Sequence, residues 1–561
     1  MVNNKKYVIG ISCFYHDSSA CLFVDGKLAY ACEEEKFTGI KHDDRFPSNS
    51  INYIFNMYGI GYDDVSAVCF YEDPNLKRER IKNNYNLSKT FHFMRSMFRF
   101  NSNQKILSKE LKKFTNSEIF YSKHHDSHLY YSAFSSDFKK SVVVSIDGVG
   151  ETDSATIGVY DGQNIKSISI GEYPNSLGLF YSAMTAFLGF RPNEGEYKVM
   201  GLSAYGSYKK YIEPLRDLVK FEDGKIICNM DYFTWNKSHN TMFSSKLYKL
   251  LDVLPRIPDS ELTSEYTDIA CAVQKVYEEL LFEILNHYSE IYEDIENICL
   301  GGGCAYNGLA NGKIYENTKF KHIWIPPSPS DAGSSVGACI NYIVNELGVK
   351  PTIPKTPFIG PTFNVTKSYK KKLRDSGVIY LEDDSLYKLI ARELYRGKVI
   401  GWYRDEIEFG ARALGNRSIL ADPSKPNMKE RINKLIKKRE GFRPFAPMVT
   451  KERQHEFFNM VDDIPYMNQV VTVKEEFRDK LPSITHVDGS ARVQTVYKDN
   501  QIHRLLREFE KISSIPILLN TSFNIKDKTM VLTPEQAIQT LRDTDMDILV
   551  LQNILIFNNK K

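Results

Sequence analysis

Short apolar runs bounded by turn residues recur near the start of the chain, and each predicts a β-strand. The first four runs cover residues 7–12, 20–24, 27–31 and 67–70. Asp25-Gly26 joins the second run to the third, and this dipeptide is typical of the two-residue turn of a β-hairpin. Farther along, apolar residues at helical spacing predict an amphipathic helix over 268–288. Strands that alternate with helices indicate the α/β fold class.

One part of this pattern occurs twice. Residues 17–26, Asp-Ser-Ser-Ala-Cys-Leu-Phe-Val-Asp-Gly, are echoed 136 positions later by residues 153–162, Asp-Ser-Ala-Thr-Ile-Gly-Val-Tyr-Asp-Gly. Each copy follows an apolar strand, at 7–12 and at 142–146. A strand, a polar loop and a hairpin repeated in this order predict a duplicated α/β domain with a cleft between its halves. A chance similarity over ten residues is the alternative.

The length of the chain predicts more than one domain, because a single hydrophobic core seldom serves 561 residues. Four prolines gather between residues 351 and 361, and all nine cysteines precede them. A boundary near residue 350 fits both observations. We therefore expect one domain over 1–350 and a second over 351–561.

Charge and composition limit the partners that the sequence favours. Lys and Arg number 73 against 70 Asp and Glu, so no strong overall field favours nucleic acid or an anionic membrane, and neither is expected as a partner. The cysteines lack CxxC spacing and lie mostly in apolar runs, which is typical of free thiols in a reducing compartment. The sequence shows no secretion signal and no apolar run long enough to span a membrane. These features predict a cytoplasmic protein.

A candidate metal site combines two histidines with two carboxylates. His124 and His128 are four residues apart, so on a helix they lie on one face and can bind one metal ion. Asp147 ends an apolar strand and opens a turn at Gly148, and Asp331 precedes a predicted helix. This ligand set suits iron(II), manganese or zinc. Solvated histidines at a helix N-terminus are the alternative.

Glycine-rich segments suggest where a nucleotide binds. Gly301, Gly302 and Gly303 follow an apolar strand and precede a helix, with Asn307 shortly after, and backbone N–H groups in such a turn can hold phosphate oxygens. The P-loop pattern is not present. Lys198 lies between glycines in a predicted loop, where it can meet an anionic oxygen, although an ordinary surface loop explains it equally well.

His16 is a candidate general base. It follows the first predicted strand at the mouth of the proposed cleft, where an imidazole can accept a proton from a hydroxyl group. The nearby charged segments 33–37 and 41–45 suit either a polar acceptor or a solvated rim. A structural histidine is the alternative.

Basic residues in the second half predict a site for a small phosphorylated anion. Arginine side chains near glycines, together with hydroxyl and amide donors after an apolar strand, favour bidentate binding of phosphate. The candidate segments are residues 410–418, 437–447 and 520–524, together with Arg492.

Taken together, these motifs resemble the O-carbamoyltransferases of nodulation and antibiotic tailoring, in order along essentially the whole chain. The matching segments are residues 15–20, 124–128, 146–148, 198–202, 301–307, 410–418, 443–447 and 520–524. The family's arginine motif is commonly Gly-Pro-Arg, whereas this chain has Gly410-Ala411-Arg412.

The resemblance implies a duplicated actin-like (ASKHA-type) N-terminal domain and a YrdC-like C-terminal domain. It implies that carbamoyl phosphate and ATP, with Mg(II), give carbamoyl adenylate and pyrophosphate, and that a hydroxylated small molecule or sugar then takes the carbamoyl group and releases AMP. It places Arg412, Lys437, Arg443, Arg492 and Ser522 at the carbamoyl phosphate site. The metal ligands would be His124, His128, Asp147 and Asp331, usually with iron(II).

Alternatives from other classes stay open at this point. Transfer of threonylcarbamoyl to tRNA uses similar domains but needs a surface for RNA, and the near-neutral charge predicts none. An actin-like kinase or ATPase would leave the C-terminal arginines without a role. The sequence decides neither the acceptor nor the oligomeric state, for which a homodimer is one option.

Overall fold

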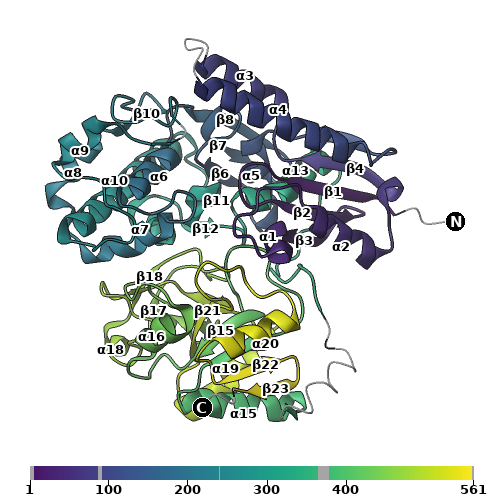
Figure 1. Ribbon diagram of the computed structural model, residues 1–561, viewed down its shortest axis with the longest axis vertical. Helices are drawn as coiled ribbons and strands as arrows, with labels where there is room; N and C mark the ends of the chain where they lie inside the picture. Colours follow the sequence, from purple (N-terminus) through teal and green to yellow (C-terminus); the bar gives the residue numbers. More distant parts are fainter. Residues whose placement is uncertain (1–4, 86–90, 239, 364, 366–377, 559–561) are drawn as a thin grey trace. The chain divides into compact units, whose positions relative to one another are not determined.

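The computed structural model describes residues 5–85, 91–238, 240–363, 365 and 378–558. The chain forms two compact units, each built of mixed α/β structure (Figure 1). Unit 1 contains residues 1–31 and 44–355, and unit 2 contains residues 32–43 and 356–561. A division of the sequence at one point does not describe this arrangement, because an N-terminal segment belongs to unit 2. No helix among the described residues is long and apolar enough to cross a membrane.

The first sheet of unit 1 has five strands in the order β3-β2-β1-β4-β5. These strands are β1 (Tyr7–Ser12), β2 (Ser19–Val24), β3 (Lys27–Glu33), β4 (Val65–Phe70) and β5 (Glu118–Tyr121). β1 is antiparallel to β2 and parallel to β4, which is parallel to β5. Asp25 and Gly26 both have positive φ, as a two-residue hairpin turn of the predicted kind requires.

The second sheet of unit 1 repeats this arrangement. Its order is β12-β11-β6-β7-β8, with β6 antiparallel to β7 and parallel to β11. The strands are β6 (Ser141–Ile146), β7 (Asp153–Tyr160), β8 (Ile165–Glu172), β11 (Asn297–Gly301) and β12 (His322–Trp324). Each strand therefore corresponds to one of the first sheet, and the predicted duplication of the domain is confirmed.

Two helices pack between these sheets and on each other. α13 (Asp331–Asn345) packs on β1, β2 and β4, and α5 (His124–Ser135) packs on β6, β7 and β11. The approach is close because glycines lie at the crossings. A Cβ on Gly337 of α13 would lie 1.7 Å from the Ser127 carbonyl oxygen, and one on Gly10 would lie 2.0 Å from that of Ser335.

The predicted helix over 268–288 is confirmed as the central part of α10 (Ser264–Ile291). The other elements of unit 1 are short apart from α3 and α4. They are α2 (Ser48–Tyr58), η1 (Tyr62–Asp64), α3 (Pro74–Tyr85), α4 (Phe91–Leu111), α6 (Leu177–Phe187), α7 (Glu196–Leu202), η2 (Ser203–Tyr205), η3 (Tyr208–Lys210), α8 (Ile212–Arg216), β9 (Val219–Glu222), β10 (Lys225–Cys228), α9 (Ser245–Leu251), η4 (Gly303–Tyr306), α11 (Gly308–Gly312) and α12 (Ile314–Asn317).

Unit 2 is built on an eight-stranded sheet in the order β13-β23-β22-β14-β15-β21-β16-β20, beside a small sheet β17-β18-β19. The strands are β13 (Ile379–Tyr380), β14 (Ile400–Tyr403), β15 (Arg417–Ala421), β16 (Ala446–Thr450), β17 (Phe458–Asn459), β18 (Val471–Val473), β19 (Ser490–Ala491), β20 (Gln494–Val496), β21 (Ile517–Ser522), β22 (Ile548–Leu551) and β23 (Ile554–Phe557). The helices are α1 (Glu34–Thr38), α15 (Asp383–Tyr395), α16 (Met428–Arg431), η5 (Ile432–Lys437), α17 (Gln454–Phe457), α18 (Glu475–Arg478), α19 (Gln501–Ser513) and α20 (Pro534–Asp543).

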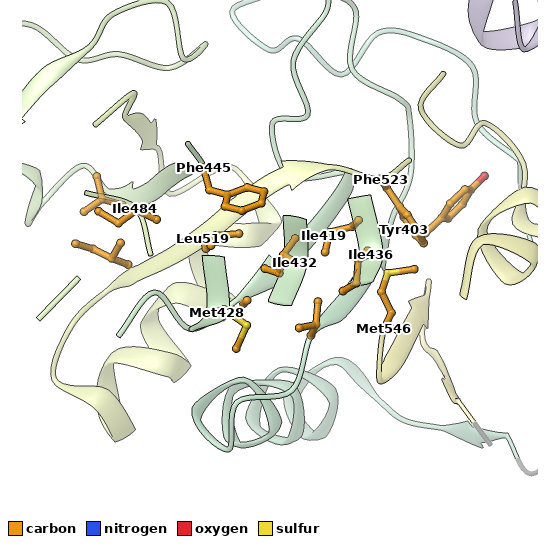
Figure 2. Packing of buried hydrophobic residues seen from close by; sticks show 14 of the residues in the cluster. Tyr403, Ile419, Met428, Ile432, Ile436, Phe445, Ile484, Leu519, Phe523 and Met546 are labelled. Carbon is orange, nitrogen blue, oxygen red and sulfur yellow. The ribbon is translucent and has the colours of Figure 1, made fainter. Parts of the chain in front are cut away.

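Both faces of the large sheet are buried. One face carries an apolar cluster that includes Ile419, Ile432 and Leu519 (Figure 2). The next residue along β15, Leu420, belongs to the opposite cluster, in which α15 and α19 supply Leu386 and Leu506. Successive residues of a strand point to opposite faces of the sheet. Because both faces are buried here, the strands of unit 2 are nearly continuous apolar runs.

The segment that unit 2 takes from the N-terminal half contains buried charges. Glu33, Glu34 and Lys36 are all less than 5% exposed. Lys36 forms an ion pair with Glu35, whose atoms are 3.1 Å apart, and the Glu33 carboxylate accepts a hydrogen bond from the Gly410 backbone. The interpretation of residues 33–37 as a solvated rim is therefore wrong, because three of the charged side chains are buried inside the protein.

Candidate functional site

The candidate metal ligands of unit 1 lie together in the structure. His124 is the first residue of α5 and His128 follows one turn later, so both rings lie on one face, and their Nε2 atoms are 3.1 Å apart. Asp147 directly follows β6, and its Oδ2 lies 3.3 Å and 3.0 Å from these two nitrogens. Asp331 opens α13, and its Oδ1 lies 3.6 Å from each of the same nitrogens.

Neighbouring groups hold these side chains in place. The His128 Nδ1 lies 3.1 Å from the Ser334 hydroxyl, and the Gly148 N–H donates to Asp147 Oδ1 over 2.7 Å. At the N-terminus of α5, the His124 N–H donates to the Glu151 carboxylate over 2.9 Å. Such second partners fix the orientation of a metal ligand.

The arrangement fits a divalent metal ion. All four side chains are buried, and their ligand atoms lie within 4.8 Å of one another. Neither oxygen of Asp331 has a hydrogen-bond partner among the described residues, which is costly for a buried carboxylate. Burial favours the neutral ring of His128, yet the hydrogen bond with Asp147 and the negative charges of Asp147 and Asp331 raise its pKa to about 9. The site therefore favours an added positive charge, and a metal ion would supply it.

His16 lies beside this cluster. Its Nε2 is 3.8 Å from Asp331 Oδ2, and its Nδ1 is 3.0 Å from Asp17 Oδ2. Both residues follow β1, and Asp17 has a φ of 50°. Burial favours the neutral ring of His16, yet the charge of Asp331 and the hydrogen bond with Asp17 raise its pKa to about 10. The ring can therefore accept a proton only when a cation bound at Asp331 offsets that charge.

The glycine-rich turn after β11 lies against the same cluster. A Cβ on Gly303 would lie 3.1 Å from Asp147 Oδ1, and one on Gly302 would lie 2.3 Å from the Ile146 carbonyl oxygen. Gly302 has a φ of 82°, which only glycine adopts without strain. Gly301 packs against Ser132 and the backbone of His128. The turn therefore brings backbone, rather than side chains, close to the candidate metal ligands.

Asn307 and Lys198, two further candidates for binding a nucleotide, contact other side chains of unit 1. The Asn307 side chain accepts a hydrogen bond from the Ala310 N–H at the start of α11 and exchanges hydrogen bonds with Gln274. Lys198 lies within helix α7, with its ammonium 5.4 Å from the centre of the Phe190 ring. The prediction of a loop around Lys198 is wrong, because residues 196–202 form a short helix that includes Gly201.

In unit 2, Lys437 is held at the end of strand β21. The residue is 3% exposed, and its ammonium donates to the carbonyl oxygens of Ser522 and Asn524, each over 2.8 Å, and to the Ser522 hydroxyl over 3.1 Å. Burial, and then the charges of Arg439 and Arg443, lower the pKa of Lys437 well below its usual range. The candidate pair Lys437 and Ser522 is therefore in direct contact.

Guanidinium groups gather around this lysine. Burial lowers the pKa of Arg492, and the charges of Arg412, Arg439 and Arg443 lower it further. The Arg443 guanidinium lies 3.4 Å from a carboxylate oxygen of Glu440. Because guanidinium groups stay charged in proteins, such crowding is a repulsion that a bound anion would relieve.

The loop that carries Arg412 is held by two buried carboxylates. One oxygen of Glu408 accepts hydrogen bonds from the backbone N–H groups of Leu414, Asn416 and Arg417, over 2.9, 2.7 and 3.1 Å. One oxygen of Glu33 accepts from the Gly410 N–H over 2.8 Å. The loop is therefore fixed at both ends by charge-assisted hydrogen bonds.

Comparison with known proteins gives the family. The model for the carbamoyltransferase N-terminus matches residues 7–340, and the model for the carbamoyltransferase C-terminus matches residues 391–558. The chain belongs to the carbamoyltransferase family. It is accordingly a transferase enzyme, and the resemblance noted from its motifs is confirmed.

Several relatives match this carbamoyltransferase over most of its length. Nodulation protein NolNO of Sinorhizobium fredii is 35% identical over 557 residues, which cover 97% of this chain and 79% of that protein. Nodulation protein NolO of Bradyrhizobium diazoefficiens is 35% identical over 77% of this chain and 78% of its own. A Synechocystis protein named as uncharacterized is 37% identical over 98% of this chain and 96% of its own.

Among solved structures, HypF of T. kodakarensis matches 62% of this carbamoyltransferase and 49% of its own chain at 12% identity. Its TM-score is 0.33, which is too low to bear on fold or function.

Sequence reasoning missed several residues that support these sites. Arg439, Asn524, Glu33, Glu151 and Glu408 were not singled out. Arg439 and Asn524 lie within motifs that were recognised, so their position next to Lys437 and Ser522 was the available indication. Glu408 lies between Ile407 and Phe409, two residues before Gly410. A carboxylate between two apolar residues just before a glycine was the available indication of a buried backbone contact.

Proposed function

We propose that this enzyme is an O-carbamoyltransferase that activates carbamoyl phosphate with ATP in unit 2 and transfers the carbamoyl group to a hydroxylated acceptor in unit 1. In this proposal unit 1 is an actin-like domain and unit 2 a YrdC-like domain. The acceptor is a small molecule or a sugar, as the resemblance implies. Membership of the carbamoyltransferase family supports the transfer itself.

The gathering of cationic side chains in unit 2 is the observation that carries the proposal. Carbamoyl phosphate is a dianion and must approach the α-phosphate of ATP, so several positive groups are needed to offset their repulsion. Besides burial, the charge of Arg443 lowers the pKa of both Lys437 and Arg492, and that of Arg412 lowers the pKa of Arg492. Ser522 contacts the lysine. Mg(II) would accompany the ATP.

Activation is proposed to take two successive reactions. The bond between phosphorus and oxygen in carbamoyl phosphate is broken by water, which gives carbamate and orthophosphate. A carbamate oxygen then attacks the α-phosphorus of ATP and expels pyrophosphate, which leaves carbamoyl adenylate. Each turnover therefore releases one orthophosphate and one pyrophosphate before transfer.

Transfer is proposed to occur at the His-Asp cluster of unit 1. The acceptor oxygen attacks the carbamoyl carbon, the bond from that carbon to the AMP oxygen breaks, and AMP leaves with the electron pair. His16 is proposed to accept the hydroxyl proton at Nε2 once a metal ion on Asp331 offsets the carboxylate charge that keeps the ring protonated. A metal ion held by His124, His128, Asp147 and Asp331, for which we propose iron(II), would polarise an oxygen of the bound adenylate. The backbone at Gly148 and at Gly301, Gly302 and Gly303 would meet phosphate oxygens, with Lys198 and Asn307 as further candidate contacts.

The test follows the phosphorus products of ATP. The purified protein, loaded with iron(II), is incubated with ATP and Mg(II), with and without carbamoyl phosphate. Pyrophosphate that forms only with carbamoyl phosphate supports the proposal, and Arg443→Ala and Lys437→Met variants should then form little. ADP formed equally with and without carbamoyl phosphate would replace the proposal with a kinase-like or ATPase function.

A further inference from the structure

The helix pair α3 and α4 carries a concentrated positive charge. The two helices lie side by side at an edge of unit 1 (Figure 1). Between residues 74 and 114, Lys and Arg supply 11 residues, whereas Glu supplies two and Asp none. Because the whole chain has a formal net charge of +3, the remaining sequence is net acidic. The near-neutral total therefore conceals a strongly basic surface.

α4 has a buried face and an apolar part on its exposed face. Phe100, Leu107 and Leu111 point inward and are at most 8% exposed. On the other side Met94 is 59% exposed and Phe98 is 78% exposed. A single exposed apolar side chain is ordinary, but these two are four residues apart and are neighbours on the helix surface.

Exposed basic residues surround this apolar pair. Arg99 pairs with Asp44, with their atoms 2.8 Å apart, and Lys113 pairs with Glu110. Six further basic residues make no ion pair within the described part of the chain, and all six are exposed. They are Arg78 and Lys82 of α3, Arg95, Lys105 and Lys109 of α4, and Lys112 just after it.

We propose that this surface, formed by the exposed side of α4 with Arg78 and Lys82 of α3, docks on a membrane that contains anionic phospholipid. A helix with an inserted apolar pair and a basic surround is the pattern of an interfacial amphipathic helix. Anionic head groups attract the lysines and arginines, while Met94 and Phe98 enter the boundary between head groups and acyl chains. A nucleic acid backbone would satisfy the charges but would leave Met94 in water. The inference goes beyond the carbamoyl-transfer reaction and does not depend on it.

Vesicle flotation of the full chain tests the proposal. The wild-type protein should float with vesicles of phosphatidylcholine and phosphatidylserine at near-physiological ionic strength and stay unbound with pure phosphatidylcholine. Replacing Arg95, Lys105 and Lys109 with Gln should reduce the partition coefficient by about fivefold for each residue, or about a hundredfold together. The double variant Met94→Ser/Phe98→Ser should also reduce binding, by roughly tenfold or more.

Matched variants elsewhere control for net charge and folding. Lys166, Lys209 and Lys319 are exposed lysines outside the helix pair, and their replacement with Gln should leave binding close to wild type. Leu254 and Ile257 are 70% and 73% exposed, so Leu254→Ser/Ile257→Ser matches the apolar change. Equal loss of binding in control and test variants would overturn the proposal. So would binding that survives Met94→Ser/Phe98→Ser, or a wild type that binds RNA or an acidic protein but no anionic vesicle.

Discussion

Replacing Glu408 with Gln should disable the Arg412 loop while leaving the rest of unit 2 folded. The Glu408 side chain is fully buried, and one oxygen accepts three backbone hydrogen bonds from the loop. The other oxygen has no hydrogen-bond partner among the described residues. Glutamine keeps the length and one acceptor oxygen, but it removes the negative charge.

The expected magnitude follows from the three bonds. A hydrogen bond to a charged group contributes about 1 kcal/mol more than a neutral one, so three such bonds give a loss of about 3 kcal/mol. That loss corresponds to roughly a hundredfold lower population of the ordered loop relative to its displaced forms. We expect kcat/KM for carbamoyl phosphate, measured by pyrophosphate release, to fall between tenfold and a hundredfold.

Asp422→Asn is the matched control. Asp422 is also buried, and its Oδ1 accepts from the Ser424 N–H over 2.9 Å. It lies at the opposite end of β15 from the loop. Both variants should lower the thermal midpoint, but only Glu408→Gln should lower kcat/KM for carbamoyl phosphate beyond that of the control. Equal values of kcat/KM in the two variants would refute the role of Glu408 in positioning the loop.

Three further predictions address the metal site, the cationic cluster and the helix crossing. Asp331→Asn should lower the metal content of the protein, measured by elemental analysis after dialysis, whereas Asp17→Asn should retain the metal. Full metal content in the Asp331→Asn variant would contradict the proposed ligand set. Because the pKa of Lys437 is lowered in the free protein, a bound dianion should raise it, so sulfate binding should take up a proton and should weaken as the pH rises. Calorimetry in buffers of different ionisation enthalpy measures this proton uptake, and the Lys437→Met variant should abolish it. Gly337→Ala should destabilise unit 1 by about 1–3 kcal/mol in a denaturant titration, because the new Cβ would meet the Ser127 carbonyl oxygen. Gly61→Ala should leave the stability unchanged, because a Cβ there has no close neighbour. Equal unfolding midpoints for the two variants would contradict the tight helix crossing.

Local patterns were sufficient to predict most of unit 1. The apolar runs and the Asp25-Gly26 turn identified the hairpin, and the echo between residues 17–26 and 153–162 identified the duplication. The candidate metal ligands could be named for a similar reason. His124, Asp147 and Asp331 lie at the boundaries of elements with a clear pattern, and His128 lies one helical turn after His124. The helix around Lys198 was not predictable, because α7 has only seven residues, follows Gly195 and contains Gly201.

Long-range burial of charge was the part that the sequence did not reveal. Residues 33–37 are dominated by acidic and basic side chains, a composition typical of a surface. In the structure Glu33 bonds to Gly410, 377 residues away, and this contact draws the segment into unit 2. Glu408 was missed although its partners lie only six to nine residues along the chain. The backbone N–H groups that it binds belong to an irregular loop, which has no periodicity in the sequence.

The duplication also accounts for the composition of the candidate metal site. α5 follows the fifth strand of the first half and α13 follows the fifth strand of the second, so His124 and Asp331 are equivalent first residues of equivalent helices. Likewise Asp147 follows β6 and His16 follows β1, which are equivalent strands. The ligand atoms converge because Gly337 lets α13 approach α5 so closely. Neither half alone contains the full set of ligands, so a chain in which the two halves separate should lose the metal and the transfer reaction together.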